Sequence, residues 1–247
     1  MRAEPVAAKY AIFGDVHSNL EAFNAVLESM KNEGVTHYAC VGDIVGYGAN
    51  PVECVEKVRA LGCKAVLGNH DAGAVEKTDI QFFNNAARSA VEWSKEVLNG
   101  PSASFLSSLP YVARTECFTL VHATLGNPEH WTYIFTAYDA ESYFRYQEDP
   151  VCFVGHTHIP CCFSTNTSQG FSRASRLRLE PGTKYIVNVG SVGQPRDGNP
   201  LASYVIYDLA EDVIRFVRVQ YDIATAQKKI IDAGLPHILA MRLGWGK

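Results

Sequence analysis

Short apolar segments that end in glycine and a polar residue recur along the first two thirds of the chain. The sequence reads YAIFGD up to Asp15, YACVGD up to Asp43, AVLGNH up to His70 and VCFVGH up to His156. Apolar runs of this length are typical of strands that are buried on both faces of a sheet. The polar residue after each strand then lies at one edge of the sheet, where ligands bind in open α/β folds. The pattern therefore predicts an α/β fold with a polar site at the strand ends.

Helical patterns separate these predicted strands. Residues 18–34 place apolar side chains at helical spacing, and Ser18 with Glu21 fits a capping box at the start. Residues 50–62 show a similar pattern, and a longer helix is predicted from about residue 80 to residue 98. The first half thus alternates strand and helix, which favours a right-handed and mostly parallel arrangement.

The last third of the chain changes character. Residues 184–194, 202–209 and 212–222 are predicted to be strands that add antiparallel pairs or a second sheet. Residues 222–234 fit an amphipathic closing helix. Residues 164–183 are rich in Ser, Thr and Gly, and we expect a surface excursion there.

Composition excludes several classes of protein. The net charge is -4 without a basic stripe, which argues against electrostatic binding of nucleic acid. No apolar run approaches the roughly 20 residues of a membrane span, and the opening residues lack the apolar core of a secretory signal. The 7 cysteines include no C-x-x-C pair, so we expect reduced, packed thiols in a cytoplasmic protein.

Counting polar residues at the strand ends points to metal chemistry. Any one of these motifs alone fits a capped turn or a structural histidine. However, 5 of the 8 histidines fall at or just beyond predicted strand ends, together with Asp15, Asp43 and Asn69. Burying so many unpaired polar groups would cost several kcal/mol each. Metal ions that accept imidazole and carboxylate ligands remove this cost, and a pair of ions sharing one carboxylate accounts for the number of ligands.

The order of the motifs resembles that of the calcineurin-like metallophosphoesterases. The motifs are GDVH at 14–17, GD at 42–43, GNHD at 68–71, the isolated His122 and GHTH at 155–158. The segments VNVGSVGQPRDGNP and AGLPHILAMRLGWG look like the small bacterial phosphodiesterase branch, which includes diadenosine-tetraphosphate hydrolase-like proteins. The resemblance implies one metallophosphoesterase domain over residues 1–247. Its fold would be a four-layer α-β-β-α sandwich of two mixed sheets flanked by helices.

The resemblance also implies a role for each site residue. One metal ion would be held by Asp15, His17 and His158, and the other by Asn69, His122 and His156. Asp43 would bridge the ions, a hydroxide held between them would attack phosphorus, and His70 would act as general acid. The cofactors would be two divalent transition-metal ions, and this ligand set suits Mn, Fe, Zn, Co or Ni.

Substrate contacts are predicted from fewer signals. Arg196 is a candidate phosphate clamp, against a surface-turn alternative, and Asn19 lies near the site. The aromatic segment 124–149 either stacks a nucleobase or packs as an excursion helix. In GDIVGYG, Gly46 and Tyr47 replace the Asp and Arg of the protein phosphatases' GDxxDRG motif, which argues against a protein phosphatase.

The expected activity is hydrolysis of a phosphomonoester, a phosphodiester or a nucleotide phosphoanhydride. The partner would be a small phosphorylated or nucleotide substrate, with no membrane. The alternatives are a non-catalytic scaffold with the same fold and a cyclic-nucleotide phosphodiesterase. The sequence leaves open the metal, the oligomeric state, with a homodimer as one alternative, and the role of Asp71, which either orients His70 or caps the turn.

Overall fold

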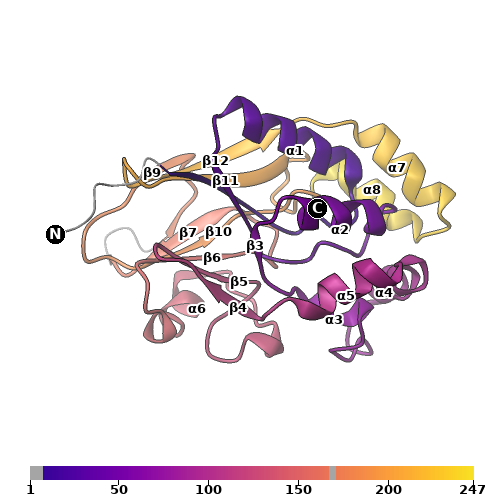
Figure 1. Cartoon of the computed structure of the whole chain (residues 1–247), viewed down its shortest axis with the longest axis horizontal. Coiled ribbons are helices and arrows are strands. Elements are labelled where there is room, and N and C mark those ends of the chain that lie inside the picture. The colour runs from indigo at the N-terminus through magenta and orange to yellow at the C-terminus, as the bar shows by residue number, and fades with distance from the viewer. Residues whose placement is uncertain (1–7, 167–170) are drawn as a thin grey trace.

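Two six-stranded sheets face each other at the centre of the molecule (Figure 1). The computed structural model describes residues 8–166 and 171–247. The first sheet has the order β3-β2-β1-β11-β12-β9, and the second β4-β5-β6-β10-β7-β8. The first is built from β1 (Lys9–Phe13), β2 (His37–Cys40), β3 (Lys64–Ala65), β9 (Arg176–Arg178), β11 (Ala202–Asp208) and β12 (Val213–Val219). The second is built from β4 (Val112–Arg114), β5 (Thr119–Val121), β6 (Val151–Val154), β7 (Cys161–Ser164), β8 (Phe171–Ser172) and β10 (Tyr185–Asn188).

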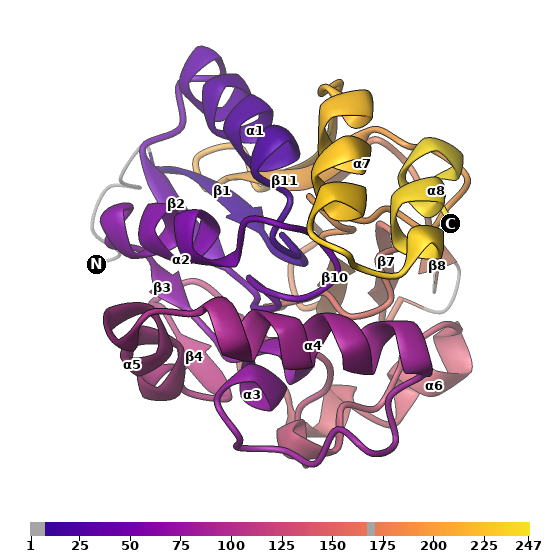
Figure 2. The ribbon, with the colours of Figure 1, turned by 90° about the vertical axis from the view of Figure 1, so that its right-hand side faces the viewer.

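Helices cover the outer faces of the two sheets. They are α1 (Leu20–Asn32), α2 (Pro51–Ala60), α3 (Asn69–Ala74), α4 (Asn85–Val97), α5 (Gly100–Ser108), α6 (Ala137–Glu141), α7 (Ile223–Asp232) and α8 (His237–Trp245), with short 3-10 turns η1 (Pro128–His130) and η2 (Phe144–Tyr146). In Figure 2, helices α1 and α2 lie at the upper left, α7 and α8 at the upper right, and α3, α4 and α5 below them. Helix α6 packs on the second sheet through Ala140. This is the expected α-β-β-α sandwich of two mixed sheets.

The apolar runs are continuous because both faces of the central strands are buried. In β1, Ala11 and Phe13 belong to the core under the helices, whereas Ile12 belongs to the core between the sheets. Phe118 and Phe153 from the second sheet join Ile12 in that inner core. Apolar side chains on both faces therefore hold the end of the strand in place. The polar residue that follows the strand is positioned by this packing.

The start of α1 differs from the predicted capping box. The cap is Asn19, whose Oδ1 accepts a hydrogen bond from the N–H of Ala22 at 3.1 Å. Ser18 has a positive φ of 55°, and its hydroxyl has no hydrogen-bond partner within the described part of the chain. The predicted Ser18–Glu21 box was therefore wrong, because the chain leaves the site through Ser18 in a left-handed conformation.

The predicted helix over residues 80–98 is shorter at its start than expected. It begins at Asn85, where Asn84 caps it by accepting from the N–H of Ala87. Asn99 then caps a further helix, α5, so the Asn-Gly-Pro sequence both ends one helix and begins the next.

The predicted strands of the last third divide between the two sheets. Strands β11 and β12 are antiparallel neighbours in the first sheet, where β11 also pairs antiparallel with β1. Strand β10 lies instead in the second sheet, parallel to β6 and antiparallel to β7. The segment 164–183 contributes β8 and β9, while residues 167–170 lie outside the described residues. So do residues 1–7, on which part of the expectation about a secretory signal rests.

All 7 cysteines are free thiols, and 5 of them are buried. Burial raises the pKa of Cys152 and of Cys161 to about 12, which leaves both as unreactive packed groups. Within residues 8–166 and 171–247, no helix has the length and apolar character needed to cross a bilayer.

Candidate metal centre

The carboxyl ends of the parallel strands in both sheets meet at one edge of the sandwich, and the predicted ligands gather there. Strands β1, β2 and β3 run parallel to one another, as do β5 and β6. The ligands that follow β1, β2 and β3 come from the first sheet, and those that follow β5 and β6 come from the second. The seven predicted ligands are no more than 7% exposed: Asp15, His17, Asp43, Asn69, His122, His156 and His158.

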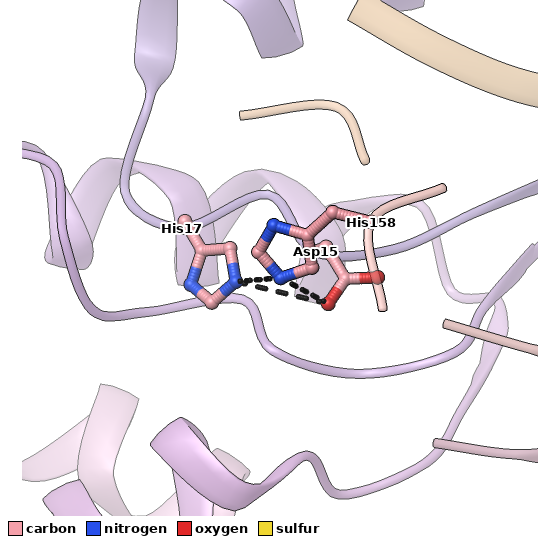
Figure 3. Close-up of side chains that lie close together, drawn as sticks. All are labelled: Asp15, His17 and His158. Carbon is pink, nitrogen blue, oxygen red and sulfur yellow. Dashed lines mark hydrogen bonds and ion pairs between the residues drawn. The ribbon is translucent and has the colours of Figure 1, made fainter. Parts of the chain in front are cut away.

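A first group of three predicted ligands joins both sheets (Figure 3). Nε2 of His17 lies 3.1 Å from Nε2 of His158. Oδ1 of Asp15 lies 3.2 Å from Nε2 of His158 and 3.7 Å from Nε2 of His17. One atom from each side chain therefore points to a common centre.

A second group forms around His122. Its Nε2 lies 3.1 Å from Oδ1 of Asn69, 3.2 Å from Nδ1 of His156 and 3.3 Å from Oδ2 of Asp43. The same Oδ2 of Asp43 also lies 3.6 Å from Nε2 of His17, in the first group. Asp43 is thus placed between the two groups, as a bridging carboxylate requires.

Hydrogen bonds to backbone carbonyls fix the tautomers of the four histidines. Nδ1 of His17, His122 and His158 lies 2.7–3.0 Å from the carbonyl oxygens of Val45, Val41 and Gln194, respectively. Nε2 of His156 lies 2.8 Å from the carbonyl oxygen of Trp131. Because a carbonyl only accepts, each of these ring nitrogens must carry the proton. The other nitrogen of each ring is left as a lone-pair donor that faces the group, as in protein metal sites.

The spacing of the donor atoms fits bound metal ions. Ligand atoms about 2.1 Å from a transition metal, at angles between octahedral and tetrahedral, are roughly 3.0–3.4 Å apart. The contacts around His122 and the His17–His158 and Asp15–His158 contacts all lie within 3.1–3.3 Å. The imidazole, carboxylate and amide donors are also of the kind that such ions accept. The residues therefore fit bound metal ions, and His17, Asp43 and His70 form a third set of closely spaced donors beside the two groups.

The electrostatics of the site favour the neutral rings of His156 and His158 and ionised carboxylates. Burial lowers the pKa of His156 to about 3 and that of His158 to about 4. Burial opposes ionisation of Asp43, but the neighbouring His122, His70 and His17 together hold the pKa of Asp43 well below its usual range. Burial would likewise lower the pKa of His122, yet Asp43 raises it to about 9, so a metal ion competes with a proton for this ring.

His70 lies beside the two groups but is held differently from the other histidines. Its ring packs against His17, Tyr47 and Phe83, with centroids 4.8, 4.4 and 5.2 Å away. Its buried Nδ1 has no hydrogen-bond partner among the described residues, and a side chain on Gly46 would come within 2.3 Å of that atom. No carbonyl therefore fixes its tautomer. Burial lowers the pKa of His70 well below its usual range.

The contacts of Asp71 decide between the two roles left open for it. Its carboxylate accepts hydrogen bonds from the backbone N–H groups of Ile44, Val45 and Gly68 at 2.8, 3.0 and 3.2 Å. It thereby caps α3 and holds the loop after Asp43. GNHD forms the start of this short helix.

Backbone strain is concentrated at the site. Asp15, His17, Asp43, His156 and His158 all have positive φ values between 48° and 67°. Non-glycine residues rarely adopt this conformation, and it persists where the surrounding structure enforces it. Five of the seven predicted ligands thus hold a costly conformation, a feature that no sequence pattern indicated.

Arg196 and Tyr47 form a polar contact next to His70. Nη2 of Arg196 donates to the Tyr47 hydroxyl at 3.1 Å and to Oε1 of Gln194 at 2.8 Å. The guanidinium carbon lies 5.5 Å from the centre of the Tyr47 ring. Tyr47, which sequence reasoning left without a role, is therefore part of the wall of the site.

Asn19 has mainly structural contacts. Its Oδ1 caps α1, and its Nδ2 donates to the carbonyl oxygen of Gly193 at 2.9 Å. These bonds tie the loop after β1 to the loop that carries Arg196. The segment 124–149 contains η1, α6 and η2, and Tyr133 from this segment stacks on His156.

Comparisons with known proteins identify the family of the chain. A sequence profile of the calcineurin-like phosphoesterase superfamily domain matches residues 9–212. Uncharacterized protein MJ0912 of Methanocaldococcus jannaschii is 42% identical over 248 residues, which cover 98% of this chain and 100% of that protein. The chain therefore belongs to the calcineurin-like phosphoesterase superfamily.

Two solved structures are similar to the chain over almost its whole length. A metallophosphoesterase from Sphaerobacter thermophilus superposes with a TM-score of 0.88 at 38% identity, covering 98% of this chain and 100% of that one. Hypothetical protein PH1004 from Pyrococcus horikoshii OT3 shares the fold, with a TM-score of 0.80 at 20% identity over 97% of this chain and 99% of that one. The protein is a metal-dependent hydrolase of phosphate esters.

The glycine before His156 provides a test of the first metal position. A Cβ at Gly155 would lie 2.3 Å from Oδ2 of Asp15, a buried carboxylate that also accepts from the N–H of His156. We expect Gly155→Ala to displace this carboxylate and to weaken metal binding by about 10- to 100-fold. Calorimetric titration of metal-free protein with Mn²⁺ measures this. Gly100→Ala is the control, because a Cβ there meets nothing within 4 Å. Unchanged Mn²⁺ affinity in Gly155→Ala would contradict the assignment of Asp15.

Proposed function

We propose that the protein is a dimetal phosphoesterase that hydrolyses a phosphomonoester, a phosphodiester or a nucleotide phosphoanhydride of small size. One metal ion would be held by Asp15, His17 and His158, and the other by Asn69, His122 and His156, with Asp43 between them. We also propose that residues 1–247 form a single domain and that the protein works in the cytoplasm. The free cysteines support this compartment.

One observation carries the proposal. Each of the four histidines in the two groups has one nitrogen tied to a backbone carbonyl and the other aimed at the shared centre. A scaffold that binds no metal would gain nothing from burying Nε2 of His17 against Nε2 of His158 at 3.1 Å, because two lone pairs that face each other cannot form a hydrogen bond. The complete ligand set therefore favours an enzyme over the scaffold.

The chain's own residues supply the remaining chemistry. When bound, the metal ions would lower the pKa of water to make a nucleophile and would neutralise charge on the phosphate. Arg196 would bind a phosphate oxygen through its guanidinium group. His70 would donate a proton to the oxygen of the leaving group. Burial favours the neutral form of His70, and an anionic phosphate beside the ring raises its pKa and restores the proton.

Removal of metal tests the activity itself. We expect chelation followed by desalting to abolish hydrolysis of p-nitrophenyl phosphate and of bis-p-nitrophenyl phosphate, because the nucleophile depends on the metal ions. Addition of Mn²⁺ should restore it, and Zn²⁺, Co²⁺, Ni²⁺ and Fe²⁺ are assayed in parallel. Full activity in protein shown by elemental analysis to be metal-free would refute the proposal.

Substitution of His70 distinguishes proton donation from metal binding. We expect His70→Asn to lower kcat by about a hundredfold to ten-thousandfold, the usual contribution of a general acid. Metal content, measured by elemental analysis, should stay at the wild-type level. His122→Asn is the matched variant, because it removes a predicted ligand and should lose metal. If His70→Asn also lost metal, His70 would be a ligand and not the acid.

Arg196 is expected to contribute to substrate binding. Loss of a charge-assisted hydrogen bond typically costs about 1.5–3 kcal/mol, so Arg196→Ala should raise KM roughly 10- to 150-fold. Arg196→Lys should be intermediate, because it keeps the charge and loses the planar fork. Steady-state kinetics measure both variants, with Arg176→Ala on the exposed strand β9 as control. A KM in Arg196→Ala equal to that of the control would assign Arg196 to the surface turn instead.

A further inference from the structure

Two exposed aromatic rings lie beside the candidate metal centre on a segment that is anchored on both sides. Ile134 is 4% exposed and belongs to the core under the second sheet. Its neighbours Tyr133 and Phe135 are 45% and 55% exposed. The segment therefore buries its central side chain and leaves the two flanking aromatic rings accessible.

These rings extend a stack that begins at a predicted metal ligand. The Tyr133 ring lies 4.0 Å from that of His156, centroid to centroid, with 20° between the planes. The Phe135 ring follows at 5.3 Å from Tyr133, with 9° between the planes. Three nearly parallel rings thus lead from the metal centre to the surface.

Hydrogen bonds hold this stack in place. The carbonyl oxygen of Trp131 accepts from Nε2 of His156 at 2.8 Å. The backbone N–H groups of Phe135 and Thr136 donate to Oδ2 of Asp139 at 3.0 and 2.9 Å. The rings are therefore ordered before any ligand arrives, which lowers the entropic cost of binding. His156 and Phe135 cover the two faces of the Tyr133 ring, so the outer face of Phe135 is the one that can stack a further planar ring.

The stack and His70 contact different predicted ligands. It adjoins His156, which contacts His122, whereas His70 packs against His17 and Tyr47. In a phosphodiester bound between the two groups, the ester group next to His70 would be the one that leaves. The group next to Phe135 would stay on the phosphate.

We propose that Tyr133 and Phe135 form a subsite for a planar aromatic ring, a nucleobase or an aryl group, on the ester group that remains on the phosphate after hydrolysis. This inference rests on the proposed phosphoesterase function and narrows its substrate to a phosphodiester with an aromatic retained group.

Binding of product-like ligands tests the subsite without turnover. Adenosine monophosphate, phenyl phosphate and ribose phosphate are titrated into the metal-loaded protein by calorimetry. We expect adenosine monophosphate to bind at least about tenfold more tightly than ribose phosphate, and Phe135→Ala to remove that difference while leaving ribose phosphate unchanged. If phenyl phosphate binds tightly, the subsite accepts any aryl ring. If phenyl phosphate binds weakly, the subsite is specific for nucleobases. Equal affinity of the wild-type protein for adenosine monophosphate and ribose phosphate would overturn the inference.

Matched variants keep this test specific. Phe135→Ala is chosen over Tyr133→Ala because Phe135 does not touch the metal ligand that Tyr133 covers. Tyr138→Ala is the control, since Tyr138 is 81% exposed, lies in α6 three residues further on, and has no stacked ring among the described residues. A loss of adenosine monophosphate binding in Tyr138→Ala equal to that in Phe135→Ala would also overturn the inference.

Turnover of two esters with the same leaving group separates this inference from the proposed function. The substrates are the p-nitrophenyl esters of thymidine monophosphate and of methyl phosphate. We expect Phe135→Ala to raise KM for the thymidine ester about tenfold and to leave its kcat unchanged. The KM and kcat for the methyl ester should both stay at the wild-type values. An equal change for both esters would refute the subsite. Failure of the metal-loaded wild-type protein to hydrolyse either ester, with the preference for adenosine monophosphate intact, would refute phosphodiester hydrolysis and leave the ring subsite standing.

Discussion

Hydrogen bonds from four imidazoles to backbone carbonyls are the constraint on which the centre depends. The carbonyls belong to Val41, Val45, Trp131 and Gln194, in loops from distant parts of the chain. Each bond sets which ring nitrogen is protonated and turns the other one inward. Without these bonds the rings could rotate or exchange tautomers, and the two groups of ligands would lose their common centres. The convergence of the strand ends therefore matters because it brings these carbonyls together as well as the ligands.

The same arrangement is costly for the metal-free protein. Asp15 and Asp43 are fully or almost fully buried, and both have left-handed backbone conformations. Gly68 lets the chain pass so close to Asp43 that a Cβ there would lie 2.1 Å from Oδ1. The apolar layers on both faces of β1 and β2 must hold these segments in place. Strain and desolvation at the centre are thus supported by the sandwich, as is typical of functional sites.

Sequence reasoning was most successful where a pattern is local. The length of the apolar runs and the glycine after each one placed Asp15, Asp43 and His156 at strand ends, and the alternation of these runs with helical patterns predicted the α/β class. It failed at the start of α1, where Asn19 and not Ser18 is the cap, because the site imposes a left-handed turn on the preceding residues. It also left open where β10 would lie, because pairing with β6 is decided by contacts remote in the chain.

The sequence by itself determined the fold class, the family and the set of side chains available for metal binding, since these follow from residue types and their order along the chain. Tertiary structure decided what those side chains can do. Asp43 stands between two groups of predicted ligands because loops from both sheets meet there, and Asp71 holds backbone N–H groups instead of His70. The stack of Phe135 on Tyr133 and His156 depends in the same way on distant segments. Distances and orientations between remote residues are set by packing, which no local pattern encodes.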